Sequence, residues 1–309
     1  MNLQPIYQTK LYGLNNFFLD FLRLYQNKNL PNKILLSGDK GLGKSTLAYH
    51  LINYVLSKDE EFNYDVKKFE INRENKSYKL TINGSNPNMN VIDNLFEKKS
   101  IDIVQIRDLI SKLNKSSFNN DDRFIIVDNI EHLNLNSINA LLKILEEPPP
   151  QTFFILINND RFIMPTLKSR CINYKIFLNH DNVINITNKL LGDDVFNRIN
   201  QDLLNYYSTP GKIYRLINFF ESNNYDLKKY NLKDFLKLII KDSLYKKNVV
   251  VKNIVFEYVE LFFRKNISNI KINPFDAYNY FVKKINDTKK FNLDEESLFM
   301  EFEYKILNG

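Results

Sequence analysis

The stretch that decides the fold is Ile34-Leu35-Leu36-Ser37-Gly38-Asp39-Lys40-Gly41-Leu42-Gly43-Lys44-Ser45-Thr46. An apolar run leads into a glycine-rich turn, and the turn leads into a segment with helical periodicity. Residues 38–45 match the phosphate-binding pattern G-x-x-x-x-G-K-[ST]. Such a loop needs glycines because its backbone passes close to the phosphates and points several N–H groups at them. A chance match to so short a pattern is the alternative. The apolar run before the loop and the helical sequence after it favour the phosphate-binding interpretation.

The residue types of this loop predict separate roles in nucleotide binding. Lys44 is expected to reach the β- and γ-phosphates, and the Ser45 hydroxyl is expected to ligate Mg²⁺. The positive end of the following helix adds to the attraction for phosphate. The residues of the loop expected to bind nucleotide are Gly38, Gly41, Gly43, Lys44, Ser45 and Thr46.

The composition is that of a globular protein without a membrane span. With 309 residues, of which 44% are apolar and 26% charged, the chain can form two or three domains with a sizeable core. No apolar run approaches the roughly 18 residues of a membrane helix, and no secretory signal is visible. The single cysteine, Cys171, excludes an internal disulfide and a cysteine-rich zinc site. We therefore expect a cytoplasmic protein with no membrane contact and no zinc.

The net charge of +7 leaves direct contact with DNA open. A basic chain suits nucleic acid or acidic partners. However, Lys, Asn, Ile, Tyr and Phe are all abundant and Trp is absent, which is typical of a bias in the coding sequence. The charge alone does not decide between these explanations.

A second buried strand is predicted at residues 123–127, and an aspartate follows it directly. Four apolar residues ending in Asp128 are typical of a parallel strand with a carboxylate at its carboxyl end. In open α/β sheets ligands lie beyond that edge, so Asp128 and the phosphate-binding loop are expected side by side. Asp128 then holds Mg²⁺ through water, rather than simply ending a strand.

The rest of the chain divides by its periodicity. Short strands are predicted at 69–71, 78–82, 153–157 and 172–177, and an amphipathic helix at 135–147 ends at three prolines. From about residue 178 helical periodicity replaces the alternation, with helices expected over 183–191, 194–207 and 211–220. After a linker near residue 223, further helices are expected to the end of the chain.

Four segments together resemble the bacterial clamp-loader subunits of the AAA+ superfamily. They are 38–46, Ile126-Val127-Asp128, the run N-A-L-L-K-I-L-E-E-P-P at 139–149, and T-L-K-S-R-C at 166–171. The resemblance covers about residues 9–220. It implies an α/β P-loop NTPase domain with a parallel sheet over 1–177, a small helical lid over 178–222 and an all-α collar for oligomerisation over 223–309.

Within these subunits the chain is more similar to the delta-prime type of DNA polymerase III than to gamma/tau. Gamma/tau subunits usually carry Asp-Glu after the second strand, four zinc-binding cysteines and a sensor arginine in the lid. Here Asn129 follows Asp128, and Cys171 belongs to the S-R-C motif. The lid turn reads S-T-P-G-K, with Gly211 near the arginine position. The intact phosphate-binding loop departs from many delta-prime relatives, whose loop is degenerate.

The resemblance implies a catalytic role for Arg170 in a neighbouring subunit. The S-R-C arginine of this family acts in trans, as an arginine finger on ATP that is bound by the adjacent subunit. Asn158 is expected to be the polar sensor near the γ-phosphate, within one residue. Asn129 cannot take a proton from water, and Glu131 lies two residues further on. The sequence therefore predicts that this subunit binds ATP with Mg²⁺ and hydrolyses it weakly or not at all.

The implied assembly is a hetero-pentameric ring with gamma/tau and delta subunits. Such a ring loads the sliding clamp onto primed DNA during replication, as part of a polymerase holoenzyme whose polymerase active site lies elsewhere. One alternative is a gamma/tau-type motor that hydrolyses ATP itself, which Asn129 argues against. Another is a different AAA+ DNA-processing ATPase, such as a helicase loader, which the S-R-C motif argues against.

Overall fold

The computed structural model describes residues 3–93, 100–113, 121–204, 208–247, 249–266, 273–291 and 293–308. The chain forms two compact units, Met1–Asn182 and Val183–Gly309. The finer division into 1–177, 178–222 and 223–309 stays a prediction.

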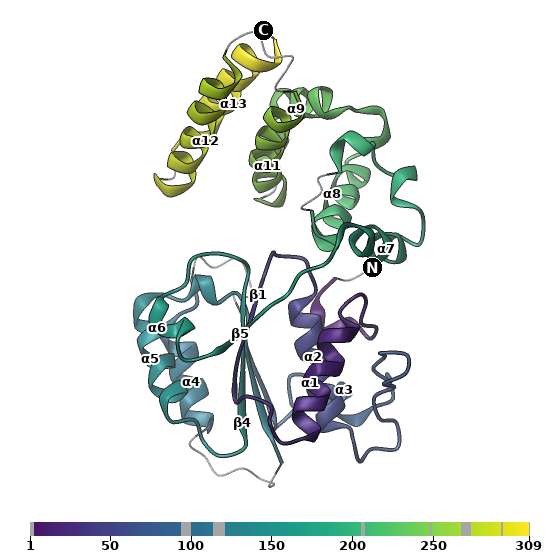
Figure 1. Ribbon diagram of the computed structural model, residues 1–309, viewed down its shortest axis with the longest axis vertical. Helices are drawn as coiled ribbons and strands as arrows, with labels where there is room; N and C mark the ends of the chain where they lie inside the picture. The colour runs from purple at the N-terminus through teal and green to yellow at the C-terminus, as the bar shows by residue number, and fades with distance from the viewer. Residues whose placement is uncertain are drawn as a thin grey trace. The chain divides into compact units, whose positions relative to one another are not determined.

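The first unit is built on a parallel five-stranded sheet in the order β2-β3-β4-β1-β5 (Figure 1). Its strands are β1 (Lys33–Ser37), β2 (Met89–Ile92), β3 (Arg123–Val127), β4 (Thr152–Asn158) and β5 (Ile172–Lys175). The register places Ser37 of β1 opposite Asn158 of β4. Val127 of β3 lies opposite Leu156, which also belongs to β4. The ends of β1, β3 and β4 therefore meet at one edge of the sheet, and the expected α/β class is confirmed.

Helices cover both faces of this sheet (Figure 1). One face carries α1 (Asn15–Gln26), α2 (Lys44–Leu56) and α3 (Lys76–Ile82), and the other carries α4 (Ile103–Leu113), α5 (Leu135–Glu146) and α6 (Pro165–Lys168). Two short 3₁₀ turns, Pro5–Tyr7 and Ile130–His132, complete the unit. Parallel strands covered on both faces are apolar at nearly every position, which is why β1, β3 and β4 are visible in the sequence as apolar runs.

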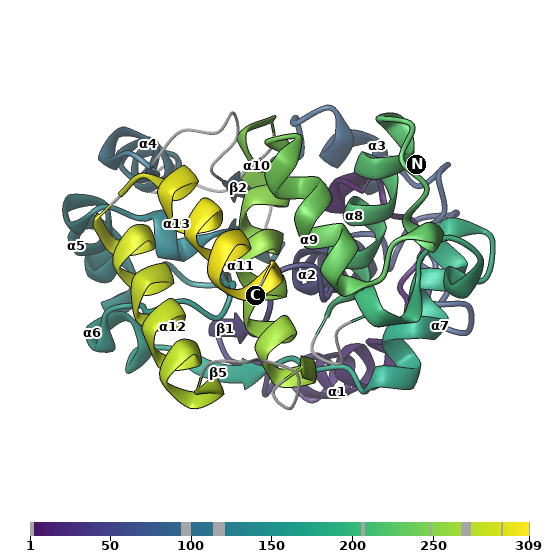
Figure 2. The same ribbon diagram turned by 90° about the horizontal axis from the view of Figure 1, so that it is seen from above.

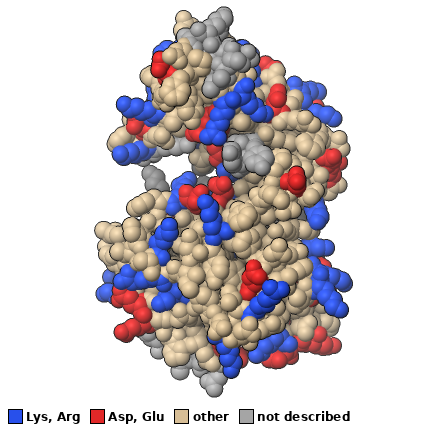
Figure 3. Space-filling view, in the orientation of Figure 1, with Lys and Arg blue, Asp and Glu red and all other residues tan. Residues whose placement is uncertain are grey.

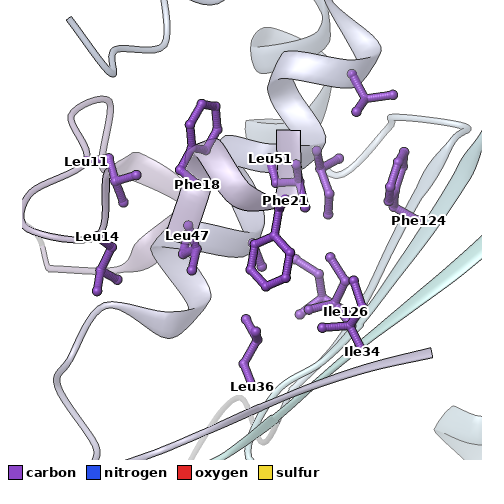
Figure 4. Close-up of a cluster of buried hydrophobic side chains, with 14 of the residues drawn as sticks. Leu11, Leu14, Phe18, Phe21, Ile34, Leu36, Leu47, Leu51, Phe124 and Ile126 are labelled. Carbon is purple, nitrogen blue, oxygen red and sulfur yellow. The ribbon is translucent and has the colours of Figure 1, made fainter. Parts of the chain in front are cut away.

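The alternation along each strand divides the core into two clusters. Phe124 and Ile126 of β3 pack with α1 and α2, where Leu47 is fully buried. Figure 4 shows these residues in one cluster. Ile125 and Val127 of the same strand pack in the other cluster, with α4 and α5. Each cluster buries a face of the sheet, and apolar burial at about 25 cal/mol per Å² is the main stabilising term.

The prediction of a strand at residues 78–82 is wrong, because these residues belong to α3. Asn75 caps this helix, with its side-chain oxygen accepting from the Tyr78 N–H at 2.8 Å. The Glu60 carboxylate accepts from the Lys76 N–H at 2.7 Å and the Ser77 N–H at 3.0 Å. These groups satisfy helix-end donors, so a short alternating sequence forms a helix. At residues 69–71, Glu70 makes isolated bridges with Lys10 and Asp65 rather than a strand.

The second unit is helical, and α7 (His180–Leu191) spans the division between the units. The α-helices after it are α8 (Pro210–Ser222), α9 (Leu232–Lys241), α10 (Leu244–Lys247), α11 (Val249–Asn266), α12 (Pro274–Phe291) and α13 (Glu295–Phe302), followed by a π-helical turn, Glu303–Leu307. Short 3₁₀ turns occupy Val195–Asn197, Gln201–Leu203 and Leu227–Lys229. Helix α11 packs against α9 and α12, and α12 packs against α13 (Figure 2).

One predicted helix of this region is replaced by two 3₁₀ turns over residues 194–204. Asp194 accepts from the Phe196 N–H and Asn200 accepts from the Asp202 N–H. Such local side-chain bonds compete with a regular helix. Residues 205–207 of that prediction lie outside the described residues. The helix predicted over 211–220 is confirmed as α8, for which Thr209 is the cap and Pro210 the first residue.

Candidate nucleotide-binding site

The loop between β1 and α2 has a backbone that its glycines make possible. Gly38, Gly41 and Gly43 have φ values of +142°, +93° and +91°. A Cβ on Gly38 would lie 2.4 Å from the carbonyl oxygen of Ile176, just after β5. The loop is therefore folded tightly against the segment that follows β5. Positive φ values at three glycines are compatible with a loop whose backbone N–H groups face an anion.

Gly38→Ala is expected to destabilise the protein by about 2–5 kcal/mol, because it combines a forbidden φ with a backbone clash. The matched control is Gly84→Ala. Gly84 has a φ of +65°, and a Cβ there meets nothing within 4 Å, so the loss should be about 1–2 kcal/mol from strain alone. Urea denaturation of the two variants measures the difference. Equal losses would contradict this account of Gly38.

Lys44, the first residue of α2, lies within the loop. Its side chain is buried, and its Nζ donates to the carbonyl oxygens of Gly38 at 2.6 Å and Asp39 at 2.7 Å. It also donates to Oδ1 of Asn159 at 3.1 Å. Burial lowers the pKa of Lys44 to about 8, against the opposing effect of Asp128 and Glu131. The ammonium group is thus held at the loop by three oxygen acceptors.

Ser45 and Asp128 meet as the sequence predicts. The Ser45 Oγ donates to Oδ2 of Asp128 at 2.5 Å, across the edge where β1 and β3 end. Burial raises the pKa of Asp128 to about 6, while hydrogen bonds from Ser45 and the Asn129 N–H act in the opposite direction. A hydroxyl and a carboxylate beside a phosphate-binding loop are the oxygen ligands that Mg²⁺ uses in nucleotide sites. The residues present therefore fit Mg²⁺ bound with a nucleotide.

Asn129 occupies the position after the strand aspartate and is held by hydrogen bonds. It has a left-handed backbone with φ +55°. Its Nδ2 donates to Oδ1 of Asp93 at 2.6 Å, and its Oδ1 accepts from Nδ2 of Asn159 at 2.9 Å. An amide cannot take a proton from water. This position therefore offers no general base.

Glu131 lies in the 3₁₀ turn after β3 and contacts the residue that follows β4. Its Oε1 accepts from Nδ2 of Asn159 at 2.9 Å, and its Oε2 accepts from the Asn159 N–H at 3.3 Å. Together with Asn129, Glu131 thus engages the amide nitrogen of Asn159. The Asn159 oxygen is left to face Lys44.

The structure distinguishes the two asparagines at the end of β4. Asn158 is buried, and its side chain closes a local turn by donating to the carbonyl oxygen of Arg161 at 3.0 Å. Asn159 is the one that bonds to Lys44. The sequence predicts Asn158 for this place to within one residue, and periodicity does not locate the end of a strand more closely than about two to four residues. Thr46 lies in the first turn of α2, next to Ser45.

Asp93 was missed by the sequence analysis. It directly follows β2, a four-residue strand that the sequence analysis did not recognise. The sheet order places β2 beside β3, which brings Asp93 to the Asn129 amide. The signal that could have found it is the pattern already used for Asp128, an aspartate after a short apolar segment.

Arg170 lies at a second place in the same unit, just after α6. Its Nη1 donates to the carbonyl oxygen of Thr166 at 2.9 Å. Its Nε and Nη2 both donate to Oε1 of Glu146, at 3.1 and 2.5 Å. The next residue, Cys171, packs against the core cluster of α4 and α5, and burial raises the pKa of its thiol to about 11. The cysteine anchors this turn inward while the arginine stays at the surface, with a third of its side chain exposed.

Neither a metal-binding cluster nor a membrane-spanning helix is found among the described residues. Across the described ranges, no group of three or more His, Cys, Asp or Glu side chains is arranged to hold a metal ion. In that same part of the chain, no helix combines the length and apolarity needed to cross a membrane.

Comparison with known proteins identifies relatives over most of the chain. The family model described as "DNA polymerase III, delta subunit" matches residues 14–179. The DNA polymerase III subunit delta′ of Buchnera aphidicola subsp. Schizaphis graminum is 29% identical over 287 residues, covering 86% of this chain and 82% of the relative. Subunit delta′ from the Acyrthosiphon pisum subspecies is 26% identical, covering 84% and 82%. The subunit gamma from the Schizaphis graminum subspecies is 28% identical over 159 residues, covering 51% and 41%.

Proposed function

Because the chain belongs to the DNA polymerase III delta-prime family of clamp-loader subunits, we propose that it binds ATP without hydrolysing it efficiently and acts on a neighbour's ATP through Arg170. The subunit works in a complex with other polymerase III subunits. In the proposed complex, gamma/tau and delta subunits complete a hetero-pentameric ring that places the sliding clamp on primed DNA.

Nucleotide binding is supported by the assembled loop. The ammonium of Lys44 exchanges its bonds to Gly38, Asp39 and Asn159 for bonds to the β- and γ-phosphates. Ser45 and Asp128 would hold Mg²⁺ beside the phosphates. Bound Mg²⁺ supplies neutralisation of phosphate charge. Asn159 takes the role of polar sensor in this proposal, since its amide oxygen already contacts Lys44.

Weak hydrolysis is supported by the residue after the strand aspartate, and this observation carries the proposal. An attacking water needs a group that orients or polarises it. Asn129 has no basic oxygen to offer, and its amide is engaged by Asp93 and Asn159. Glu131 is an acid, but its two oxygens accept from Asn159. The site therefore has the groups for holding nucleotide and lacks a free carboxylate for water among these residues.

We propose no direct contact between this subunit and DNA. On the face that Figure 3 shows, basic and acidic side chains are interspersed rather than gathered by sign. Several surface lysines are paired with acids, among them Lys212 with Glu257 at 2.9 Å and Lys246 with Glu296 at 2.6 Å. The proposal therefore assigns contact with primed DNA to the complex.

The purified chain is expected to bind ATP–Mg²⁺ but to turn it over no faster than its Lys44→Ala variant. At ATP concentrations about 100-fold above the dissociation constant, binding should stabilise the folded chain by about 2.7 kcal/mol. Thermal denaturation with and without nucleotide measures binding, and phosphate release measures turnover. Brisk hydrolysis that Lys44→Ala abolishes would overturn the proposal in favour of a gamma/tau-type motor.

A further inference from the structure

The guanidinium of Arg170 is fixed by two acceptors that both belong to this subunit. One is the Thr166 carbonyl oxygen, four residues earlier, which also accepts from Ser169 Oγ at 3.1 Å. The other is the Glu146 carboxylate, at the last residue of α5. The N-A-L-L-K-I-L-E-E-P-P segment and the S-R-C segment are therefore joined through Glu146 and Arg170.

The pattern of these bonds determines which donors stay available. A guanidinium has five N–H groups: one on Nε and two on each terminal nitrogen. The Glu146 carboxylate accepts from Nε and Nη2, and the Thr166 carbonyl oxygen accepts from Nη1. These three bonds leave one further N–H on each terminal nitrogen. Because a guanidinium is planar and Glu146 accepts from Nε and Nη2 on one side of it, the remaining Nη2 N–H lies on the side away from Nε.

We propose that Glu146 is a positioning residue that holds Arg170 so that its remaining terminal N–H groups can meet a phosphate on a neighbouring subunit. This inference rests on the proposed function, because it concerns the same arginine finger. Two parallel N–H groups match two oxygens of a phosphate. The carboxylate does not compete for them, since it occupies the other side of the guanidinium. The neighbour's phosphate therefore meets an arginine that is already oriented.

Orientation matters because a flexible arginine would have to be ordered during the reaction. Misplacing a catalytic group by about 1 Å can slow a reaction about 100-fold. Arg170 is a third exposed and Glu146 about half exposed, with side-chain exposures of 33% and 53%. Such an exposed pair adds little to stability. Its contribution should therefore be seen in the rate of ATP hydrolysis and not in the melting temperature of the subunit.

The test is the ATPase of the clamp loader reconstituted from full-length subunits, with clamp and primed DNA present. Glu146→Ala is expected to lower kcat about tenfold, with KM for ATP changed less than about twofold, since the neighbour's own loop binds the nucleotide. Glu146→Gln should stay within about twofold of wild type, because its amide oxygen still accepts from Nε and Nη2. The matched control is Glu147→Ala, the next residue and also exposed, which should leave kcat unchanged.

Further measurements separate positioning from a structural role. The melting temperature of the purified Glu146→Ala subunit should equal that of wild type, and Glu146→Ala should have no further effect when Arg170→Ala is already present. An unchanged or raised kcat in Glu146→Ala would overturn the inference. So would an equal loss in Glu147→Ala or in Glu146→Gln. If Arg170→Ala itself leaves kcat unchanged, the proposed function fails; if Arg170→Ala lowers kcat and Glu146→Ala does not, only this inference fails.

Discussion

Arg170→Ala is expected to lower the clamp-loading ATPase of the reconstituted complex at least about tenfold. The arginine belongs to a surface turn that Cys171 anchors and that Glu146 orients. If it meets the γ-phosphate of the neighbouring subunit, it neutralises charge that grows in the transition state. An arginine finger contributes about 10³–10⁵ in rate at its own site.

Two substitutions control for effects on folding and on charge. Arg170→Lys keeps the positive charge but cannot present two parallel N–H groups, so it should recover only part of the rate. Lys168→Ala removes an exposed cation from α6, two residues away, and should leave the rate unchanged. Steady-state phosphate release with clamp and primed DNA measures all three variants. A wild-type rate in Arg170→Ala would remove the arginine finger from the account.

Lys44→Ala is expected to weaken ATP binding by the purified chain by about 10- to 150-fold. Charge-assisted hydrogen bonds of this kind contribute about 1.5–3 kcal/mol. Among the described residues of the loop, Lys44 is the buried lysine whose ammonium bonds to the loop carbonyl oxygens. The nucleotide-dependent rise in melting temperature should largely disappear. Isothermal titration with a slowly hydrolysed ATP analogue gives the affinity directly.

The control for this variant is Lys40→Ala, the other lysine of the loop, whose side chain is exposed. It should keep affinity within about threefold, as expected for a surface charge. Because Lys44→Ala also leaves the carbonyl oxygens of Gly38 and Asp39 without their donor, Lys44→Met is a useful second variant that keeps the buried stem. Unchanged affinity in both Lys44 variants would contradict nucleotide binding at this loop.

The central strands and the helix after the loop could be predicted from the sequence, because burial on both faces produces apolar runs such as 123–127. Strand β2 (Met89–Ile92) could not. It has only four residues, one of which is the polar Asn90, and its pairing with β3 is not visible in the sequence. Helix α3 was missed because Glu60, 16 residues before Lys76 and outside the helix, helps to cap it. Tertiary contacts of this kind are not encoded in a local pattern.

The candidate site was predictable where one motif carries several residues. Lys44 and Ser45 follow from the loop, and Asp128 follows from the end of a buried strand; the structure brings Ser45 and Asp128 into contact. The network around Asn159 was not predictable, because it joins the ends of three strands. Its geometry depends on side-chain directions at β-strand ends, where a shift of one residue reverses the direction.

The most direct test of the account compares Arg170→Ala and Lys44→Ala in the same reconstituted clamp loader, with ATPase rates measured in the presence of clamp and primed DNA. We predict that Arg170→Ala lowers the rate at least about tenfold, and that Lys44→Ala lowers it clearly less. That ranking follows if this subunit holds its own nucleotide without using it and contributes catalysis to its neighbour. A larger loss in Lys44→Ala than in Arg170→Ala would contradict the account.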